Sequence, residues 1–306
     1  MTYSIVALDE ATGDLGVAVQ TRWLNVGAWV PWVEPGVGAV ATQSFTEPGH
    51  GFNGLRLMRE GLSAPEALAR VLGTDPGEAT RQVGMVDAAG RSAAHTGTGC
   101  VRYASHLVEP GVSVQANMME RATVPAAMLE AYRGARGDLA ARLLAALRAA
   151  EGEGGDVRGR QSAALLVAPG IATDGPPEAS VPPWARRHDL RVEDSRAPLD
   201  ELARLLDLAR AYDAMGEAEQ AGLRGDSAGV AAAGARSLEL APDDDMVVLW
   251  SAVGLAMGGR TAEARAALAS ATAVEPRSAE HLRRFAEAGH LPGGADVLRA
   301  LGIERT

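Results

Sequence analysis

The chain has 306 residues, which is enough for two domains that each bury a core of their own. Its formal charge of -10 argues against a nucleic-acid partner, because such binding needs clustered basic side chains that neutralise phosphates. A single cysteine, Cys100, excludes an intramolecular disulfide and fits a reducing compartment. With no signal-peptide pattern and no run of about 18 apolar residues, we expect a cytoplasmic protein without a membrane partner.

Two β-rich runs, residues 2–8 and 15–21, open the chain and are joined by an acidic turn that contains a glycine. We expect them to pair antiparallel, with Thr2 opposite Thr21. Side-chain alternation then places Thr2, Ser4 and Thr21 on one face. Because both faces of this hairpin are otherwise largely apolar, we expect other layers to cover it on each side.

Thr2 is a candidate nucleophile. Removal of Met1 is favoured when the second residue is small, and it would give Thr2 a free α-amine beside its own hydroxyl. An α-amine has an unperturbed pKa of about 7.7–8.0, so near neutral pH it can accept the hydroxyl proton. The alternative is that Thr2 is an ordinary second residue, and the pattern around it must decide.

Three tryptophans, Trp23, Trp29 and Trp32, follow the hairpin and either wall a pocket near Thr2 or pack in a core or subunit interface. Further along, the polar block Thr42, Gln43 and Ser44 follows an apolar strand at Val37–Val40 and precedes a predicted glycine-rich loop at 48–54. Its side chains either donate to an oxyanion or a substrate, or satisfy the backbone of the loop. Asn117, which ends another strand-like run, is a further candidate of this kind.

A polar, glycine-rich segment at 154–162 lies between a predicted helix at 137–151 and an apolar strand at Ala163–Ala168. Asp156 paired with an arginine is expected to orient the Thr2 amine or to bind a substrate carboxylate, since arginine offers a planar fork. A solvated loop with an ordinary ion pair is the alternative. The candidate substrate-binding residues are Ser44, Asp156, Arg158, Arg160, Gln161 and Ser162.

Motifs for metals and nucleotides are absent from the sequence. His50 and His95 have no partner at metal-ligand spacing, and neither a Walker loop nor a dinucleotide-binding glycine pattern occurs. We therefore expect no metal and no cofactor.

A proline-rich loop at 171–187 and a last strand near His188–Val192 end the mixed region, and the strand signal vanishes beyond Pro198. The alanine- and leucine-rich remainder repeats: Gly225 through Pro242 aligns with Gly259 through Pro276, a period that resembles the tetratricopeptide repeat, or TPR. The predicted helices are 200–221, 226–240, 244–257 and 260–274, with a partial unit after Ser278. They either present a groove to a protein or peptide partner or pack on the first domain or a second subunit.

Several blocks of the first two thirds of the chain resemble the bacterial and archaeal family called DUF1028, in the same order. They are residues 2–7, 16–20, 31–32, 36–44, 81–83, 114–117 and 154–163. This family is grouped with the N-terminal-nucleophile (Ntn) hydrolases. The resemblance implies that residues 1–198 form a four-layer αββα sandwich. The repeat predicts that residues 199–306 form an all-α, TPR-like module, so the expected fold class is α+β.

The resemblance also implies a function. We expect an amidohydrolase that forms a homo-oligomer and acts on a small amide, peptide or γ-glutamyl compound. The catalytic set would be Thr2, Ser4, Thr21, Thr42, Gln43 and Asn117. The alternative is a non-catalytic scaffold whose helices hold a protein or peptide partner.

Overall fold

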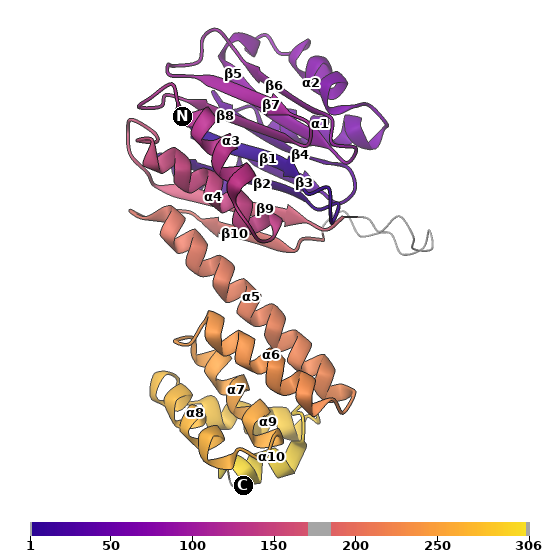
Figure 1. Cartoon of the computed structure of the whole chain (residues 1–306), viewed down its shortest axis with the longest axis vertical. Helices are drawn as coiled ribbons and strands as arrows, with labels where there is room; N and C mark the ends of the chain where they lie inside the picture. Colours follow the sequence, from indigo (N-terminus) through magenta and orange to yellow (C-terminus); the bar gives the residue numbers. More distant parts are fainter. Residues whose placement is uncertain (1, 171–184, 304–306) are drawn as a thin grey trace. The chain divides into compact units, whose positions relative to one another are not determined.

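The computed structural model describes residues 2–170 and 185–303 (Figure 1). Met1 and most of the predicted proline-rich loop at 171–187 lie outside the described residues. The chain divides into two compact units, residues 1–203 and 204–306. Each is described by itself below.

Two antiparallel sheets form the centre of the first unit. The six-stranded sheet has the order β10-β9-β2-β1-β8-β7 and the four-stranded sheet the order β3-β4-β5-β6. The strands are β1 (Thr2–Leu8), β2 (Leu15–Thr21), β3 (Pro31–Glu34), β4 (Gly38–Ser44), β5 (Arg81–Asp87), β6 (Ser92–Thr96), β7 (Ser105–Glu109), β8 (Val112–Asn117), β9 (Ser162–Ala168) and β10 (His188–Val192). The predicted strands at 163–168 and 188–192 are therefore confirmed.

The hairpin of β1 and β2 has the predicted register, with Thr2 opposite Thr21 and Leu8 opposite Leu15. Its turn contains Gly13 at a φ of 74°, a conformation that a side chain disfavours. β1 pairs on its other edge with β8, which places Asn117 beside Thr2. Thr2 therefore begins an interior strand of the larger sheet.

Helices cover the outer face of each sheet, while the inner faces of the two sheets pack together (Figure 1). Val17, Val19, Val33 and Ala41 belong to one buried cluster between the sheets. Helices α3 (Val124–Gly134) and α4 (Leu139–Gly152) pack on the larger sheet, and α1 (Pro48–Arg59) and α2 (Ala64–Leu72) on the smaller. Two short 3-10 turns, η1 (Val26–Ala28) and η2 (Glu78–Thr80), complete the unit. The hairpin is thus covered on both faces, as its apolar pattern predicted.

The glycine-rich loop predicted at 48–54 is wrong, because these residues form the first half of α1. The Glu47 side chain accepts a hydrogen bond from the Gly49 amide at 2.9 Å and so caps the helix, and Pro48 begins it. The glycines serve packing: a Cβ on Gly51 would lie 2.2 Å from Cδ1 of Trp32. Glycine content by itself predicts a flexible loop, but at Gly51 the missing side chain instead permits a close approach of the helix to Trp32.

The predicted helix at 137–151 is confirmed as α4, which starts at Leu139 because the Asp138 side chain caps it by accepting from the Ala141 amide. Its face toward the sheet carries Leu143, whose Cδ1 would lie 2.6 Å from a Cβ on Gly16 of β2. The helix and the strand therefore approach closely.

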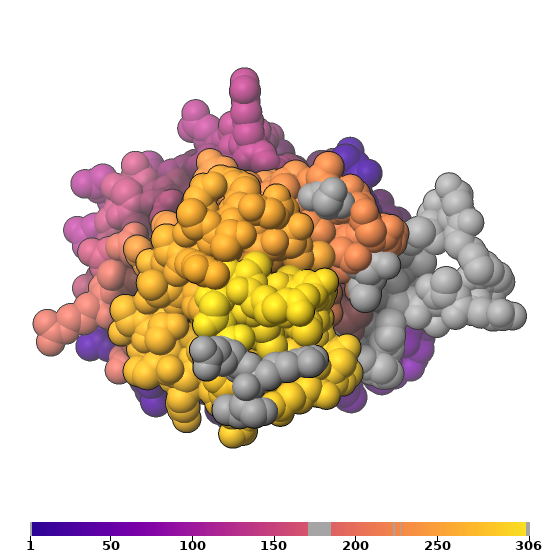
Figure 2. All heavy atoms as spheres, turned by 90° about the horizontal axis from the view of Figure 1, so that it is seen from below, coloured from indigo at the N-terminus to yellow at the C-terminus, as the bar shows by residue number. Residues whose placement is uncertain are grey.

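The second unit is helical, as predicted. Its helices are α5 (Pro198–Leu223, which begins in the first unit), α6 (Ser227–Leu240), α7 (Asp245–Met257), α8 (Thr261–Val274), α9 (Ser278–Glu287) and α10 (Gly294–Leu301). The internal repeat is visible in the structure: Gly225 and Gly259 both adopt a φ of 73° just before α6 and α8. Leu249, Leu268, Leu282 and Leu298 join helices α7 to α10 in one core. Figure 2 shows residues near the end of the chain, in yellow, flanked by the orange residues of this unit.

None of the helices in the described part of the chain is both long and apolar enough to cross a bilayer.

Candidate functional site

Thr2 lies at the start of β1 with its side chain almost completely buried. Its hydroxyl donates to Oγ1 of Thr21 on the neighbouring strand at 3.0 Å. Alternation along β1 places Ser4 on the same face, where its hydroxyl donates to Oε1 of Gln43 at 2.7 Å. The grouping of Thr2, Ser4 and Thr21 expected from the register is therefore present in the structure.

A cavity of about 370 Å³ lies over Thr2. The residues that line it are Thr2, Thr21, Trp23, Val26, Trp29, Val30, Ser44, Phe45, Thr46, Val101 and Arg158. Its aromatic members are unusually exposed, with Trp23, Trp29 and Phe45 at 66%, 51% and 57%. Two of the three tryptophans thus wall this cavity, whereas Trp32 packs against α1.

The carbonyl of Thr2 is held by two buried side-chain amides. Nε2 of Gln43 donates to it at 3.2 Å, and Nδ2 of Asn117 donates to it at 3.3 Å. Both amides also donate to Oε1 of Gln82, at 2.7 and 2.8 Å. Because Gln43 and Asn117 are fully buried and do not line the cavity, their positions do not support the oxyanion role expected of them. They fix the backbone that carries Thr2.

The amide network continues through two glutamines that were not among the predicted site residues, Gln82 on β5 and Gln115 on β8. Nε2 of Gln82 donates to Oγ1 of Thr96 at 2.9 Å and to the Ala116 carbonyl at 2.9 Å. Nε2 of Gln115 donates to Oγ of Ser4 at 2.7 Å. A polar residue within an otherwise apolar strand was the signal for both, since a buried amide needs a partner across the sheets.

Thr42 lies on the opposite face of β4 from Gln43, so it does not face Thr2. Its hydroxyl donates to the carbonyl of Glu47 at 3.1 Å and so holds the chain that enters α1. This placement follows from strand alternation, which separates two consecutive residues onto different faces. Ser44, two positions after Thr42, has a positive φ of 70° and lines the cavity.

Asp156 and Arg158 form a fixed pair beside the cavity. The fully buried Asp156 carboxylate accepts from Nε of Arg158 at 3.0 Å and from its Nη2 at 2.7 Å. It also accepts from the backbone amides of Arg22 and Arg158. The guanidinium that lines the cavity is therefore held in one orientation by a two-point contact.

Arg160 lies elsewhere, because its Nη1 is 3.4 Å from the carboxylate of Glu151 on α4. The same carboxylate accepts a hydrogen bond from the Tyr3 hydroxyl at 2.6 Å. Burial, and then the negative charge of Glu151, raise the pKa of Tyr3 well above its ordinary value, so the phenol stays neutral. These residues lie on the helix-covered face of the sheet, and Arg160 is not brought to Thr2.

Ser162 and Gln161 do not line the cavity but bind segments next to it. The Ser162 hydroxyl donates to the Trp23 carbonyl at 2.5 Å and accepts from the Val26 amide at 3.1 Å. It therefore fixes the segment that carries the tryptophans. Gln161 accepts from Nη1 of Arg22 and donates to Asp194 at 3.0 Å, outside the cavity.

Of the twelve predicted site residues, the cavity therefore contains Thr2, Thr21, Ser44 and Arg158. Within the described residues, no group of three or more His, Cys, Asp or Glu side chains is placed to hold a metal ion. The chemistry that the cavity offers is a hydroxyl pair, one guanidinium and exposed aromatic rings.

Comparison with known proteins gives a family and a related structure. A family model described as "Family of unknown function (DUF1028)" matches residues 2–202. The crystal structure of a DUF1028 protein from Silicibacter pomeroyi is 32% identical in sequence, with a TM-score of 0.58. The alignment covers 67% of this chain and 87% of that one. No curated protein matches the chain.

Proposed function

We propose, from the premise that this chain belongs to the DUF1028 family, that its first unit is an N-terminal-nucleophile amidohydrolase that acts through Thr2. The observation that carries the proposal is the position of Thr2. This residue starts an interior strand of the larger sheet and lines a cavity of about 370 Å³. In the first unit, two sheets pack face to face between two helical layers, and Thr2 lies at a strand end. This is the arrangement expected of an Ntn hydrolase.

Once Met1 is removed, the Thr2 amine is the base. It accepts the proton of the Thr2 hydroxyl as Oγ1 attacks an amide carbonyl, and an acyl-enzyme forms on Oγ1. The amine then returns the proton to the departing nitrogen, and water hydrolyses the ester. Thr21 orients the hydroxyl by accepting its hydrogen bond, while Gln43 and Asn117 hold the Thr2 carbonyl and so keep the residue in register.

The cavity suggests the kind of amide. Its volume suits a small molecule or one or two residues of a peptide. The exposed rings of Trp23, Trp29 and Phe45 offer contact to an apolar group. Arg158, held by Asp156, places a positive charge at the wall of the cavity, which suits a carboxylate. A small N-acylated amino acid, a dipeptide or a γ-glutamyl compound has these groups.

The first experiment is mass spectrometry of the purified protein, in which we expect a chain that begins at Thr2. A panel of N-acyl amino acids, dipeptides and γ-glutamyl anilides is then assayed with wild type, Thr2→Ala and Thr2→Ser. We expect turnover of at least one compound, a loss of at least about 10³-fold in kcat for Thr2→Ala, and partial retention for Thr2→Ser.

The control is Thr46→Ala, which removes a hydroxyl from the same cavity without touching the nucleophile. Retained Met1, or equal turnover by wild type and Thr2→Ala, would remove Thr2 from the mechanism. A protein with no turnover on the whole panel would favour the non-catalytic scaffold instead.

For the second unit we propose a TPR-like module. The support is the spacing of equivalent helices. α6 and α8 begin 34 residues apart, at Ser227 and Thr261, and α7 and α9 begin 33 residues apart, at Asp245 and Ser278. Such helix pairs stack on their neighbours and leave a groove for a partner.

A further inference from the structure

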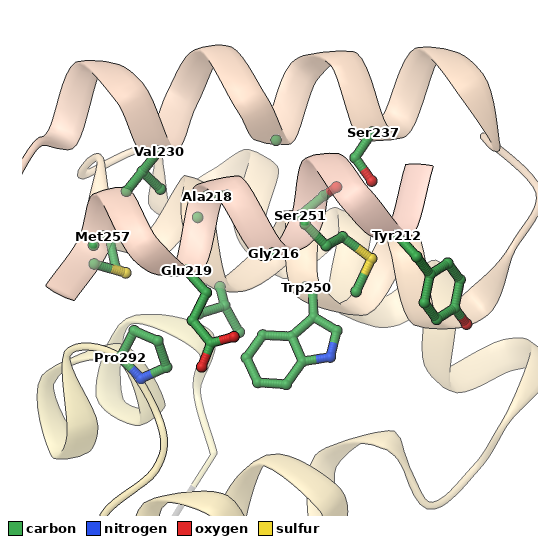
Figure 3. A pocket seen from close by; sticks show the side chains of 15 residues that line it. Tyr212, Gly216, Ala218, Glu219, Val230, Ser237, Trp250, Ser251, Met257 and Pro292 are labelled. Carbon is green, nitrogen blue, oxygen red and sulfur yellow. The ribbon is translucent and has the colours of Figure 1, made fainter. Parts of the chain in front are cut away.

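The helical unit contains a cavity of about 300 Å³ that the Thr2 chemistry does not use. Residues of α5, α6 and α7 line it, together with Pro292 (Figure 3). Four glycines, Gly216, Gly222, Gly234 and Gly254, are among the lining residues. Because glycine has no side chain, these positions leave open the space between the helices.

One aromatic ring and one carboxylate define the chemistry of this cavity. In Figure 3 the Trp250 indole and the Glu219 carboxylate project to the same side of α5 and α7. Phe285 packs edge-on to the indole with its ring centroid 5.5 Å away, and His281 does so at 6.2 Å. The aromatic wall is therefore held from one side while it lines the cavity.

Glu219 is the only charged residue that lines the cavity, and no ion pair or hydrogen bond to it is found in the described part of the chain. Its neighbour Glu217, by contrast, pairs with Arg236. A carboxylate and an indole that line the same cavity are complementary to an organic cation, because the carboxylate attracts its charge and the ring face interacts favourably with it.

The surroundings have the same sign of charge. Residues 204–257 hold nine Asp or Glu and four Arg, and no arginine lines the cavity. Tyr212, at the cavity and 43% exposed, has its pKa raised by burial and then by the negative charges of Asp244 and Asp245. The potential around the cavity is thus negative, which attracts and retains a positive ligand.

We propose that this cavity binds the side chain of a lysine or arginine that a partner protein presents on a peptide segment. The apolar wall of Val230, Val253 and Met257 takes the alkyl part, and Trp250 and Glu219 take the cationic end. A volume of about 300 Å³ accommodates one or two side chains, and the exposed Tyr212 puts one wall of the cavity at the surface, where the peptide backbone lies. This chain has no lysine of its own, so a lysine must come from another protein.

The test uses the full-length protein and isothermal titration calorimetry. The probes are n-butylammonium, the neutral n-butanol, a capped Ala-Leu-Lys-Leu-Ala peptide, and the same peptide with norleucine in place of lysine. We expect each cationic probe to bind about five- to thirtyfold more tightly than its neutral counterpart, and the lysine peptide to bind more tightly than butylammonium.

Glu219→Gln and Trp250→Leu should each remove most of the preference for the cation. Glu217→Gln is the matched control, because it neutralises a carboxylate on the same helix that does not line the cavity. Circular dichroism checks that the helices remain folded in each variant. Glu219 is exposed, so Glu219→Gln is expected to leave the fold unchanged.

Equal binding of cationic and neutral probes, binding by none of them, or an unchanged preference in Glu219→Gln would overturn the proposal. Butylammonium that binds as tightly as the lysine peptide would also overturn it, by assigning the cavity to a free organic cation. Thr2→Ala should leave all of these affinities unchanged, so the outcome does not depend on the hydrolase.

Discussion

Gln82 shows how single residues hold the candidate site together. Its Oε1 accepts from Gln43 and Asn117, and its Nε2 donates to Thr96 and to the Ala116 carbonyl. Gln82, Gln43 and Asn117 are fully buried, whereas Thr96 is partly exposed. A buried amide in such a position is stabilising only while each of its partners is present.

Replacement of Gln82 by Met is therefore expected to lower the free energy of unfolding by about 2–4 kcal/mol, because the amides of Gln43 and Asn117 lose an acceptor. Urea denaturation measures this. Gln161→Met is the matched control, since it makes the same change in a half-exposed side chain and should cost less than about 1 kcal/mol. A difference within error between the two variants would show that the network adds no stability.

At the scale of elements, α1 depends on glycine for its approach to β3. The helix lies over Trp32, and at Gly51 the missing Cβ makes room for the indole. The same helix carries Gly54, where a Cβ would lie 2.8 Å from Cε of Met85, the end of a flexible side chain. Gly51 is the more demanding position, because a rigid ring faces it.

Gly51→Ala is expected to destabilise the first unit by about 1–3 kcal/mol, since the ring or the helix must move, although alanine is the better helix former. The comparison is Gly134→Ala at the end of α3, where nothing lies within 4 Å of the added Cβ, and which should be neutral or slightly stabilising. Thermal unfolding of the two variants measures both effects. A Gly51→Ala protein as stable as wild type would mean that Trp32 can move aside without cost.

At the scale of the whole molecule, the two units have separate cores. In the first unit, Val17 belongs to a cluster between the sheets, and Val83 belongs to a cluster that β4 and β5 form with α1 and α2. In the second unit, a cluster around Leu249 joins helices α7 to α10. Because cooperative unfolding follows the contiguous core, each unit is expected to unfold in its own transition.

Leu249→Ala should thus shift only the transition of the helical unit, by about 2–5 kcal/mol, and Leu143→Ala on α4 only that of the first unit. Urea denaturation followed by circular dichroism, with turnover or Thr2 reactivity as the probe of the first unit, separates the two. A single transition that moves with either variant would contradict the assignment of independent units.

Local pattern by itself determined the β1–β2 register, helix α4 and the helical repeat, because alternation, capping residues and period act over neighbouring positions. It also grouped Thr2, Ser4 and Thr21 on one face. Only the tertiary structure decided that Gln43 and Asn117 hold the backbone of Thr2, that Thr42 faces α1, and that residues 48–54 are helical. The reason is that these outcomes depend on partners far along the chain, such as Gln82 and Trp32, which packing brings close and which no local spacing specifies.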